Sequence, residues 1–124
     1  RTVAANSTRL KQVAGKGWAA LGDAVISFDP LSSQGMFHAM ASAMQLKELI
    51  SRFDVVSNPH ELKTIQFIGE YVNQTDHIWE HYVKHKNLFY RAEMRWPDSP
   101  FWKRRHCASG ELPIRTGRVV PNPD

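Results

Sequence analysis

The 124-residue sequence has one cysteine and no long apolar run. The single Cys107 excludes an internal disulfide and a zinc site built on cysteines, and it fits a reducing compartment, so we expect a cytoplasmic protein. The first ten residues lack the apolar centre of a signal peptide, and no stretch is long enough to span a bilayer. We therefore expect no membrane partner.

Two nucleotide-binding fingerprints are also missing. Gly15 and Gly17 precede an apolar stretch, and no third glycine follows at the spacing of a Rossmann GxGxxG motif. Gly17 and Gly22 have the spacing of P-loop glycines. However, Asp23 stands where the phosphate-binding lysine should be, and its charge would repel the phosphate.

The charge balance is basic, with a net charge of +4, while a hydrophobic content of 42% and a charged content of 23% are ordinary for a globular domain. Part of the excess lies near the C-terminus, at Lys103, Arg104, Arg105, Arg115 and Arg118. A basic cluster beside aromatic residues can bind nucleic acid. More often it is a solvated face or a set of partners for carboxylates, so we expect no nucleic-acid partner.

A strand, an acidic turn, a loop and a helix are predicted in succession over residues 17–50. The apolar run Trp18–Leu21 predicts a buried strand, and Gly22-Asp23 predicts a turn after it. From Met36 onward, apolar side chains recur at three- and four-residue spacing, which predicts a helix. The loop holds no lysine or arginine, so a ligand at the helix start would meet backbone N–H groups.

This order of elements has a second interpretation. A strand, turn, loop and helix can form a plain packed connection, in which Asp23 is an ordinary turn residue. The methionine-rich helix is then an ordinary core helix.

Two motifs in this stretch resemble those of a known family. Gly22-Asp23-Ala24 is followed by the run FDPLSSQGM over residues 28–36. Together they resemble the second FAD-binding motif of flavin-dependent monooxygenases and tryptophan-halogenase-like flavoproteins. A looser likeness extends through the aromatic and basic segment 101–105. The likeness is closest to the branch that hydroxylates aromatic side chains, including flavoproteins that install tryptophylquinone cofactors in partner proteins.

The resemblance implies FAD as the cofactor. The carboxylate of Asp23 would hold the ribityl hydroxyls, and the amides of Ser33–Met36 would face the N1–C2=O edge of the flavin. The partial positive charge of the helix N-terminus would favour anionic reduced flavin by roughly 0.3–2 kcal/mol. The expected cofactor-binding residues are Gly22, Asp23, Pro30, Ser33, Gln34, Gly35 and Met36.

The resemblance also implies an activity. The chain would be the C-terminal portion of a FAD-dependent, monooxygenase-like oxidoreductase that hydroxylates an aromatic substrate through a flavin C4a-hydroperoxide. The substrate would be an aromatic small molecule or a protein-borne aromatic side chain. The partner would be the N-terminal remainder of the same enzyme, without which this fragment would be inactive.

Alternative functions follow from departures from the family pattern. Tryptophan halogenases carry Ser-Thr-Gly where this chain has Ser33-Gln34-Gly35, which disfavours halogenation but keeps it as the alternative activity. A non-catalytic helical interaction module is the alternative from another class. No catalytic acid or base is assigned. His38 is the titratable residue nearest the loop, although a histidine beside methionines in a helix more often serves packing.

The first helix is predicted from about Gln34 to near Phe53. A second, long helix has Asn58 as its predicted N-cap and Pro59 at its first position, and it runs to His85 or beyond. Its apolar side is predicted to gather Leu62, Ile65, Ile68, Val72, Trp79, Tyr82 and Val83.

The chain after this helix is predicted to hold one more short helix and a tail. The long helix should end before Pro97. Ser99 then caps a short helix that begins at Pro100. From Ala108 onward, prolines and glycines predict an extended tail.

Three histidines, His77, His81 and His85, are spaced four residues apart on the opposite side of the long helix. Imidazoles one turn apart can share a zinc ion. However, glutamate does not follow the first histidine, so the general base of a zinc protease is misplaced. We therefore predict no metal site, and a polar surface that faces solvent or the rest of the enzyme.

The N-terminal segment completes the prediction. Thr2–Asn6 favours a short strand, a turn is expected over residues 6–8, and Gly15–Gly17 predicts a tight turn. The fold class is α+β and predominantly helical, and the resemblance implies the C-terminal segment of a glutathione-reductase-like FAD-binding α/β fold. The predicted divisions are a FAD-domain part (1–53), a helical region (54–107) and a tail (108–124).

Overall fold

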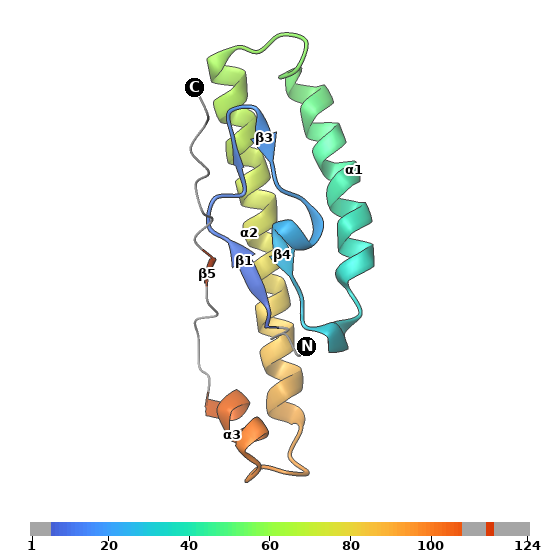
Figure 1. The fold of residues 1–124 in the computed structure, drawn as a ribbon, viewed down its shortest axis with the longest axis vertical. Coiled ribbons are helices and arrows are strands. Elements are labelled where there is room, and N and C mark those ends of the chain that lie inside the picture. Colours follow the sequence, from blue (N-terminus) through green and yellow to red (C-terminus); the bar gives the residue numbers. More distant parts are fainter. Residues whose placement is uncertain (1–5, 108–113, 116–124) are drawn as a thin grey trace, which may run out of the picture.

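The computed structural model describes residues 6–107 and 114–115 of the 124-residue chain. Two long helices, α1 and α2, run side by side in opposite directions, and short strands pack along them (Figure 1). The short helix α3 lies at the end where α2 finishes. The fold is therefore α+β and mostly helical, as the sequence predicts.

The helices are α1 (Gly35–Phe53), α2 (Glu61–Ala92) and α3 (Pro100–Cys107), and two 3-10 turns, η1 (Gly22–Ala24) and η2 (Pro30–Ser32), precede them. The strands are β1 (Thr8–Leu10), β2 (Ala14–Gly15), β3 (Trp18–Ala19), β4 (Ile26–Ser27) and β5 (Ile114–Arg115).

Strand β1 is the centre of a three-stranded sheet. It pairs antiparallel with β4, where Arg9 lies opposite Ile26, and parallel with β5, where Arg9 lies opposite Ile114. The buried Arg9 side chain also forms an ion pair with Asp76 on α2. This pair fixes the sheet to the long helix.

Strands β2 and β3 form a separate hairpin, which confirms the predicted tight turn at Gly15–Gly17. Gly17 has a φ of +78°, which favours glycine. A Cβ on Gly15 would lie 2.5 Å from the indole nitrogen of Trp18, so a larger residue there would displace the Trp18 side chain.

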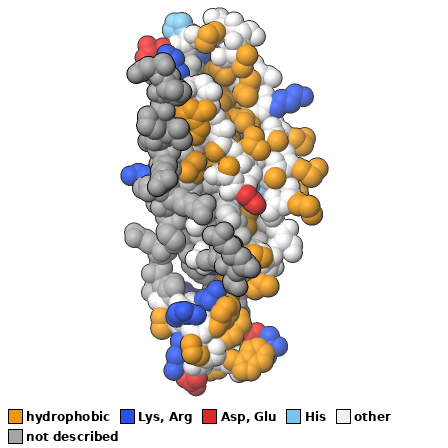
Figure 2. Space-filling model, in the orientation of Figure 1, with side chains coloured by type: hydrophobic (Ala, Val, Ile, Leu, Met, Phe, Trp, Pro, Cys, Tyr) orange, Lys and Arg blue, Asp and Glu red, His pale blue; other side chains and the backbone are white. Residues whose placement is uncertain are grey.

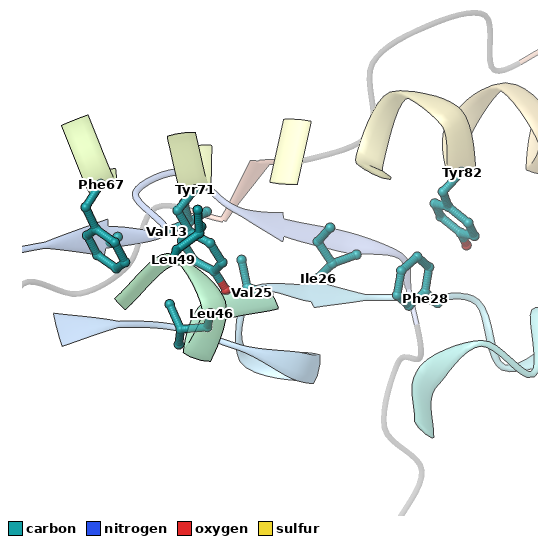
Figure 3. Close-up of a cluster of buried hydrophobic side chains, with 10 residues drawn as sticks. Val13, Val25, Ile26, Phe28, Leu46, Leu49, Phe67, Tyr71 and Tyr82 are labelled. Carbon is teal, nitrogen blue, oxygen red and sulfur yellow. The ribbon is translucent and has the colours of Figure 1, made fainter. Parts of the chain in front are cut away.

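The hydrophobic core lies between the strands and the two long helices (Figure 3). In the close-up it extends from Phe67 at one end to Phe28 and Tyr82 at the other. Its buried members are Val13, Ala14, Val25, Ile26, Phe28, Leu46, Leu49, Phe67, Tyr71 and Tyr82.

The prediction of a buried strand over Trp18–Leu21 is wrong. Only its first two residues pair as strand β3, and Trp18 and Leu21 are 46% and 40% exposed. The deeply buried strand is β4, in which Ile26 is 0% exposed. A two-residue strand is too short to produce a periodic signal, so the sequence did not reveal it.

The predicted turn over residues 6–8 is also wrong, because Thr8 begins strand β1. The polar composition of this segment favours a turn locally, but pairing with β4 overrides that preference. Most of the strand predicted at Thr2–Asn6 lies outside the described residues.

The predicted C-terminal ends of the two long helices are confirmed, but the predicted start of the second helix is wrong. Helix α1 ends at Phe53 and α2 runs on to Ala92, before Pro97. The N-cap of α2 is His60, not the predicted Asn58, because the His60 Nδ1 accepts a 3.3 Å hydrogen bond from the Leu62 N–H. Helix α2 therefore starts at Glu61, two residues after Pro59.

The buried face of α2 differs from the predicted one at its N-terminal end. Leu62 and Ile65 are 58% and 59% exposed, whereas Phe67 and Tyr71 point into the core. The predicted Tyr82 is buried, and the others pack against the core in part: Ile68, Val72, Trp79 and Val83. The first turns of α2 therefore face the core with Phe67 and Tyr71, and turn Leu62 and Ile65 toward solvent.

The predicted short helix is confirmed as α3, which begins at Pro100, with the Lys103 N–H donating to the Ser99 carbonyl oxygen (2.9 Å). Of the predicted extended tail, only β5 lies within the described residues, and it is extended. None of the helices in the described ranges is long and apolar enough to cross a lipid bilayer.

Leu49→Ala tests the position of the core. Leu49 is 1% exposed, so its truncation leaves a cavity and should lower the free energy of unfolding of the protein by about 2–5 kcal/mol. The matched control is Leu62→Ala, which removes the same atoms from an exposed position and should cost well under half as much. Urea denaturation measures both, and equal losses would contradict the described core.

Candidate functional site

The turn η1 is packed closely against the first half of α1. Gly22 has a φ of +58°, and a Cβ on it would lie 3.3 Å from the Cβ of Ala39. Its N–H donates a 3.2 Å hydrogen bond to the Ser42 hydroxyl. Glycine permits both the backbone conformation and the close approach, so η1 carries the next residue, Asp23, to the start of α1.

The Asp23 carboxylate lies beside the N-terminus of α1. Its Oδ1 is 3.7 Å from the place that a Cβ on Gly35 would occupy. The side chain is exposed, and no residue in the described part of the chain donates a hydrogen bond to it. An acceptor with both oxygens available therefore faces the space in front of the helix.

The first backbone N–H groups of α1 are open as well. Gln34 is the N-cap and provides no side-chain hydrogen bond. The amides of Gln34, Gly35 and Met36 have no partner among residues 6–107 and 114–115, whereas the Ser33 N–H donates to the Pro30 carbonyl oxygen (3.2 Å). Three of the four predicted amides are thus free to bind a ligand, and the helix dipole favours negative charge there.

His38 lies one turn into α1 and is buried, with 7% of its surface exposed. Its ring makes an edge contact with Phe28 at 4.9 Å between centroids, and its Nε2 has no hydrogen-bond partner among the described residues. Burial lowers the pKa of His38, and the nearby Asp23 carboxylate offsets part of this effect. The imidazole is therefore neutral at pH 7.

Asp29 holds the loop between β4 and α1, residues 28–34, through each of its polar groups. Its N–H donates to the Tyr82 hydroxyl (2.7 Å), and its Oδ2 accepts from the Tyr90 hydroxyl. Its Oδ1 accepts from the Leu31 N–H (3.0 Å), and its carbonyl oxygen accepts from the Ser32 N–H (2.9 Å) and hydroxyl (2.7 Å). The loop is therefore fixed by side chains of α2 as well as by its own turn.

A polar cluster extends from these tyrosines. The Tyr82 and Ser7 hydroxyls share a 2.6 Å hydrogen bond, and the Lys86 ammonium donates to the Ser7 hydroxyl (3.3 Å). The ammonium also lies 6.0 Å from the Tyr82 ring centroid and 5.9 Å from that of Tyr90. Burial raises the pKa of both tyrosines, and burial lowers the pKa of Lys86 against the opposing charge of Asp29.

A cavity of about 900 Å³ opens between the loop, the second half of α2 and α3. The loop contributes Asp29, Leu31, Ser32 and Gln34 to its wall, and α3 contributes Trp102. The wall from α2 and the residue after it consists of His77, Ile78, His81, Tyr82, His85, Lys86, Phe89, Tyr90 and Glu93. Four of the fourteen lining residues are Tyr, Phe or Trp, and three more are histidines.

Comparison with known proteins identifies the family. The tryptophan halogenase family matches residues 1–120. This chain belongs to that family. It is also 37% identical over 90 residues to "Putative FAD-dependent oxidoreductase LodB" of Marinomonas mediterranea, an alignment that covers 73% of this chain and 22% of that protein.

The match therefore spans about a fifth of the length of this relative. The family and the relative's name both support the FAD cofactor that the sequence motifs imply, and the predicted resemblance is confirmed. No solved structure is significantly similar to the chain.

The structure brings some of the predicted family-motif residues together. Asp23 and Gly35 are neighbours, and Gln34 lies on the cavity wall. Pro30 is the first residue of η2, and Ser33 ends that turn with a φ of +53°. The Met36 side chain is 85% exposed.

Several residues at the site were not predicted as site residues. Tyr82 was expected only in the core, and Asp29, Lys86, Tyr90 and Trp102 had no predicted role. The spacing of Tyr82, Lys86 and Tyr90 at four residues was the available signal, because it places them on one face of a helix. The sequence could not indicate that this face meets the halogenase-like loop.

The three histidines form part of the cavity wall and not only a polar surface. The His81 and His85 rings lie 4.1 Å apart between centroids, and the His85 Nδ1 makes a 2.8 Å hydrogen bond with the His81 carbonyl oxygen. Within the described ranges, no group of three or more histidine, cysteine or acidic side chains is arranged to hold a metal ion.

The lowered pKa of His38 predicts a dependence of stability on pH. The pKa of His38 in the folded state lies below its ordinary value of about 6.5. As the pH falls through 6.5, His38 therefore binds a proton in the unfolded chain while it stays neutral in the folded chain. Unfolding is therefore favoured progressively until the folded-state pKa is passed. His38→Phe should lose less thermal stability than the wild type between pH 7 and pH 5. Parallel pH profiles of the two melting temperatures would contradict this assignment.

Proposed function

We propose that this chain is the part of a FAD-dependent oxidoreductase that contacts the ribityl chain and the ring of the flavin. The enzyme hydroxylates an aromatic substrate. The observation that carries the proposal is the pairing of an unbonded carboxylate, Asp23, with open amides at the start of α1. The family match and the name of the relative support the FAD cofactor and the oxidoreductase class. Hydroxylation is the finer part of the proposal.

The described residues fit a flavin. Asp23 is an acceptor for the ribityl hydroxyls, and the N–H groups of Gln34, Gly35 and Met36 are donors for the N1–C2=O edge. Gly35 has no side chain, so a flat ring can approach the backbone. FAD supplies the redox and oxygen chemistry when bound, and the protein orients the ring and excludes water.

The cavity beside the loop fits an aromatic substrate. Its volume of about 900 Å³ is typical of small-molecule sites. Phe89, Tyr90 and Trp102 supply aromatic walls, and Gln34 connects the cavity with the helix start. The substrate class is thus an aromatic ring, carried either by a small molecule or by a side chain of another protein.

Halogenation is the second candidate activity, and the family match favours it. Gln34 stands where the resemblance gives halogenases a threonine, which favours hydroxylation instead. Product analysis with labelled oxygen and with bromide distinguishes the two, because one product carries the isotope and the other the halogen.

The outer face of α1 supports a partner in the same polypeptide. Met36, Phe37, Met40 and Met44 are each more than 70% exposed, and hydrophobic side chains line this edge of the molecule (Figure 2). Such a stripe is larger than scattered surface apolar residues and marks an interface. The remainder of the enzyme would cover it. The stripe alone would also suit an interaction module, but the open helix start and the cavity favour an enzyme.

Asp23→Ala tests the flavin role. The loss of a charge-assisted hydrogen bond should raise the dissociation constant for FAD of the full-length apoenzyme about tenfold to hundredfold. Titration followed by flavin absorbance measures it. The control is Asp98→Ala, an exposed carboxylate that forms an ion pair with Lys103, and it should leave FAD binding unchanged. Unchanged affinity in the Asp23 variant would remove the basis of the proposal.

Gly35→Ala separates binding from folding. A Cβ at this position makes only an ordinary contact of 3.7 Å with the Asp23 carboxylate, so the fold should keep its melting temperature. The new methyl group stands in front of the open amides and should weaken FAD binding. The control is Gly69→Ala, where nothing lies within 4 Å and alanine should stabilise α2 by about 1 kcal/mol. Full FAD affinity in Gly35→Ala would place the ring elsewhere.

A further inference from the structure

The loop with the proposed flavin contacts has little packing of its own. No residue of η2 is buried, and Leu31 within it is 81% exposed. Phe28 is held in the core, but hydrophobic contacts cannot fix the path that follows it, from Asp29 to Gly35. The hydrogen bonds of Asp29 must do so instead.

Two of these hydrogen bonds come from a distant part of the chain. Tyr82 and Tyr90 bond to Asp29 across 53 and 61 residues of sequence, and both come from the face of α2 that looks onto the cavity. The bond with Tyr82 positions the Asp29 backbone, and the bond with Tyr90 positions its carboxylate. Together they fix both the place and the orientation of the residue that caps η2.

The two hydroxyls are themselves held in place. Tyr82 is 5% exposed, meets the Phe28 ring edge-on at 4.7 Å, and shares its hydrogen bond with Ser7. Tyr90 is 9% exposed and lies 5.8 Å from the Trp102 ring between centroids. A buried aromatic ring with packed neighbours keeps one orientation, so these hydroxyls are fixed points for the loop.

We propose that Tyr82 and Tyr90 are positioning residues of the flavin site, which act through Asp29 without touching the flavin. Only five residues lie between Asp29 and Gly35, and η2 and the left-handed Ser33 account for four of them. A shift at Asp29 therefore moves the start of α1 relative to Asp23. This role rests on the proposed function, because it concerns how the same site meets the flavin.

The chain offers a matched control in Tyr71. This tyrosine is also buried on α2, and its hydroxyl donates a 2.6 Å hydrogen bond to the Ala20 carbonyl oxygen, away from the loop. Tyr82→Phe, Tyr90→Phe and Tyr71→Phe each remove one hydroxyl from the same helix. A purely structural role would give all three variants the same behaviour.

The experiment uses the full-length enzyme and two measurements. Amide hydrogen exchange over residues 29–35 reports the loop directly and needs no flavin. The dissociation constant and visible absorption spectrum of added FAD report the site. Tyr82→Phe and Tyr90→Phe should exchange at least about fivefold faster over the loop and bind FAD about fivefold more weakly, with a shifted flavin spectrum, as expected for one lost hydrogen bond. Tyr71→Phe should lower the melting temperature and change neither measurement.

Three results would overturn the proposal. The first is loop exchange in Tyr82→Phe and Tyr90→Phe no faster than in Tyr71→Phe. The second is faster exchange with FAD affinity and spectrum unchanged, which would make the tyrosines loop anchors without a role in flavin positioning. The third is a wild-type enzyme that binds no FAD. That result overturns the proposed function itself and is recognised from the wild type alone.

Discussion

The close packing of the turn η1 on helix α1 is the constraint on which the site depends. Gly22 has a backbone conformation that favours glycine, and a Cβ on it would make an unusually tight contact of 3.3 Å with the Cβ of Ala39. Ser42 completes the contact by accepting the Gly22 N–H. Without this contact Asp23 would not stand beside the open amides, and neither group alone would define a ligand site.

Helix α1 has two different halves on its buried side. The half near the site buries His38 and Ser42, whereas the other half buries Leu46 and Leu49 in the core. The apolar half supplies stability through area removed from water. The polar half holds the turn and places a neutral imidazole near Asp23. One helix thus anchors the site in the core and forms part of that site.

The sequence predicts the long helices and the family motif well, because their signals are local. The periodicity of α1 and the motif around Asp23 are both contained in about thirty consecutive residues. The contacts of Asp29 with Tyr82 and Tyr90 could not be predicted, since they join residues more than fifty positions apart. Strand β4 was missed for a similar reason: pairing with β1 defines it, and not its own composition.

The length of α2 has a consequence for how the molecule opens. Its 32 residues extend about 48 Å, so the helix passes well beyond the core that Phe67 and Tyr71 help to build. The last turns of the helix contact chiefly the loop and α3, through Tyr90. Local unfolding follows the weakest packing, so fraying will start at this end and the core will resist longest. The half of the structure that holds the candidate site is therefore the half that should open first.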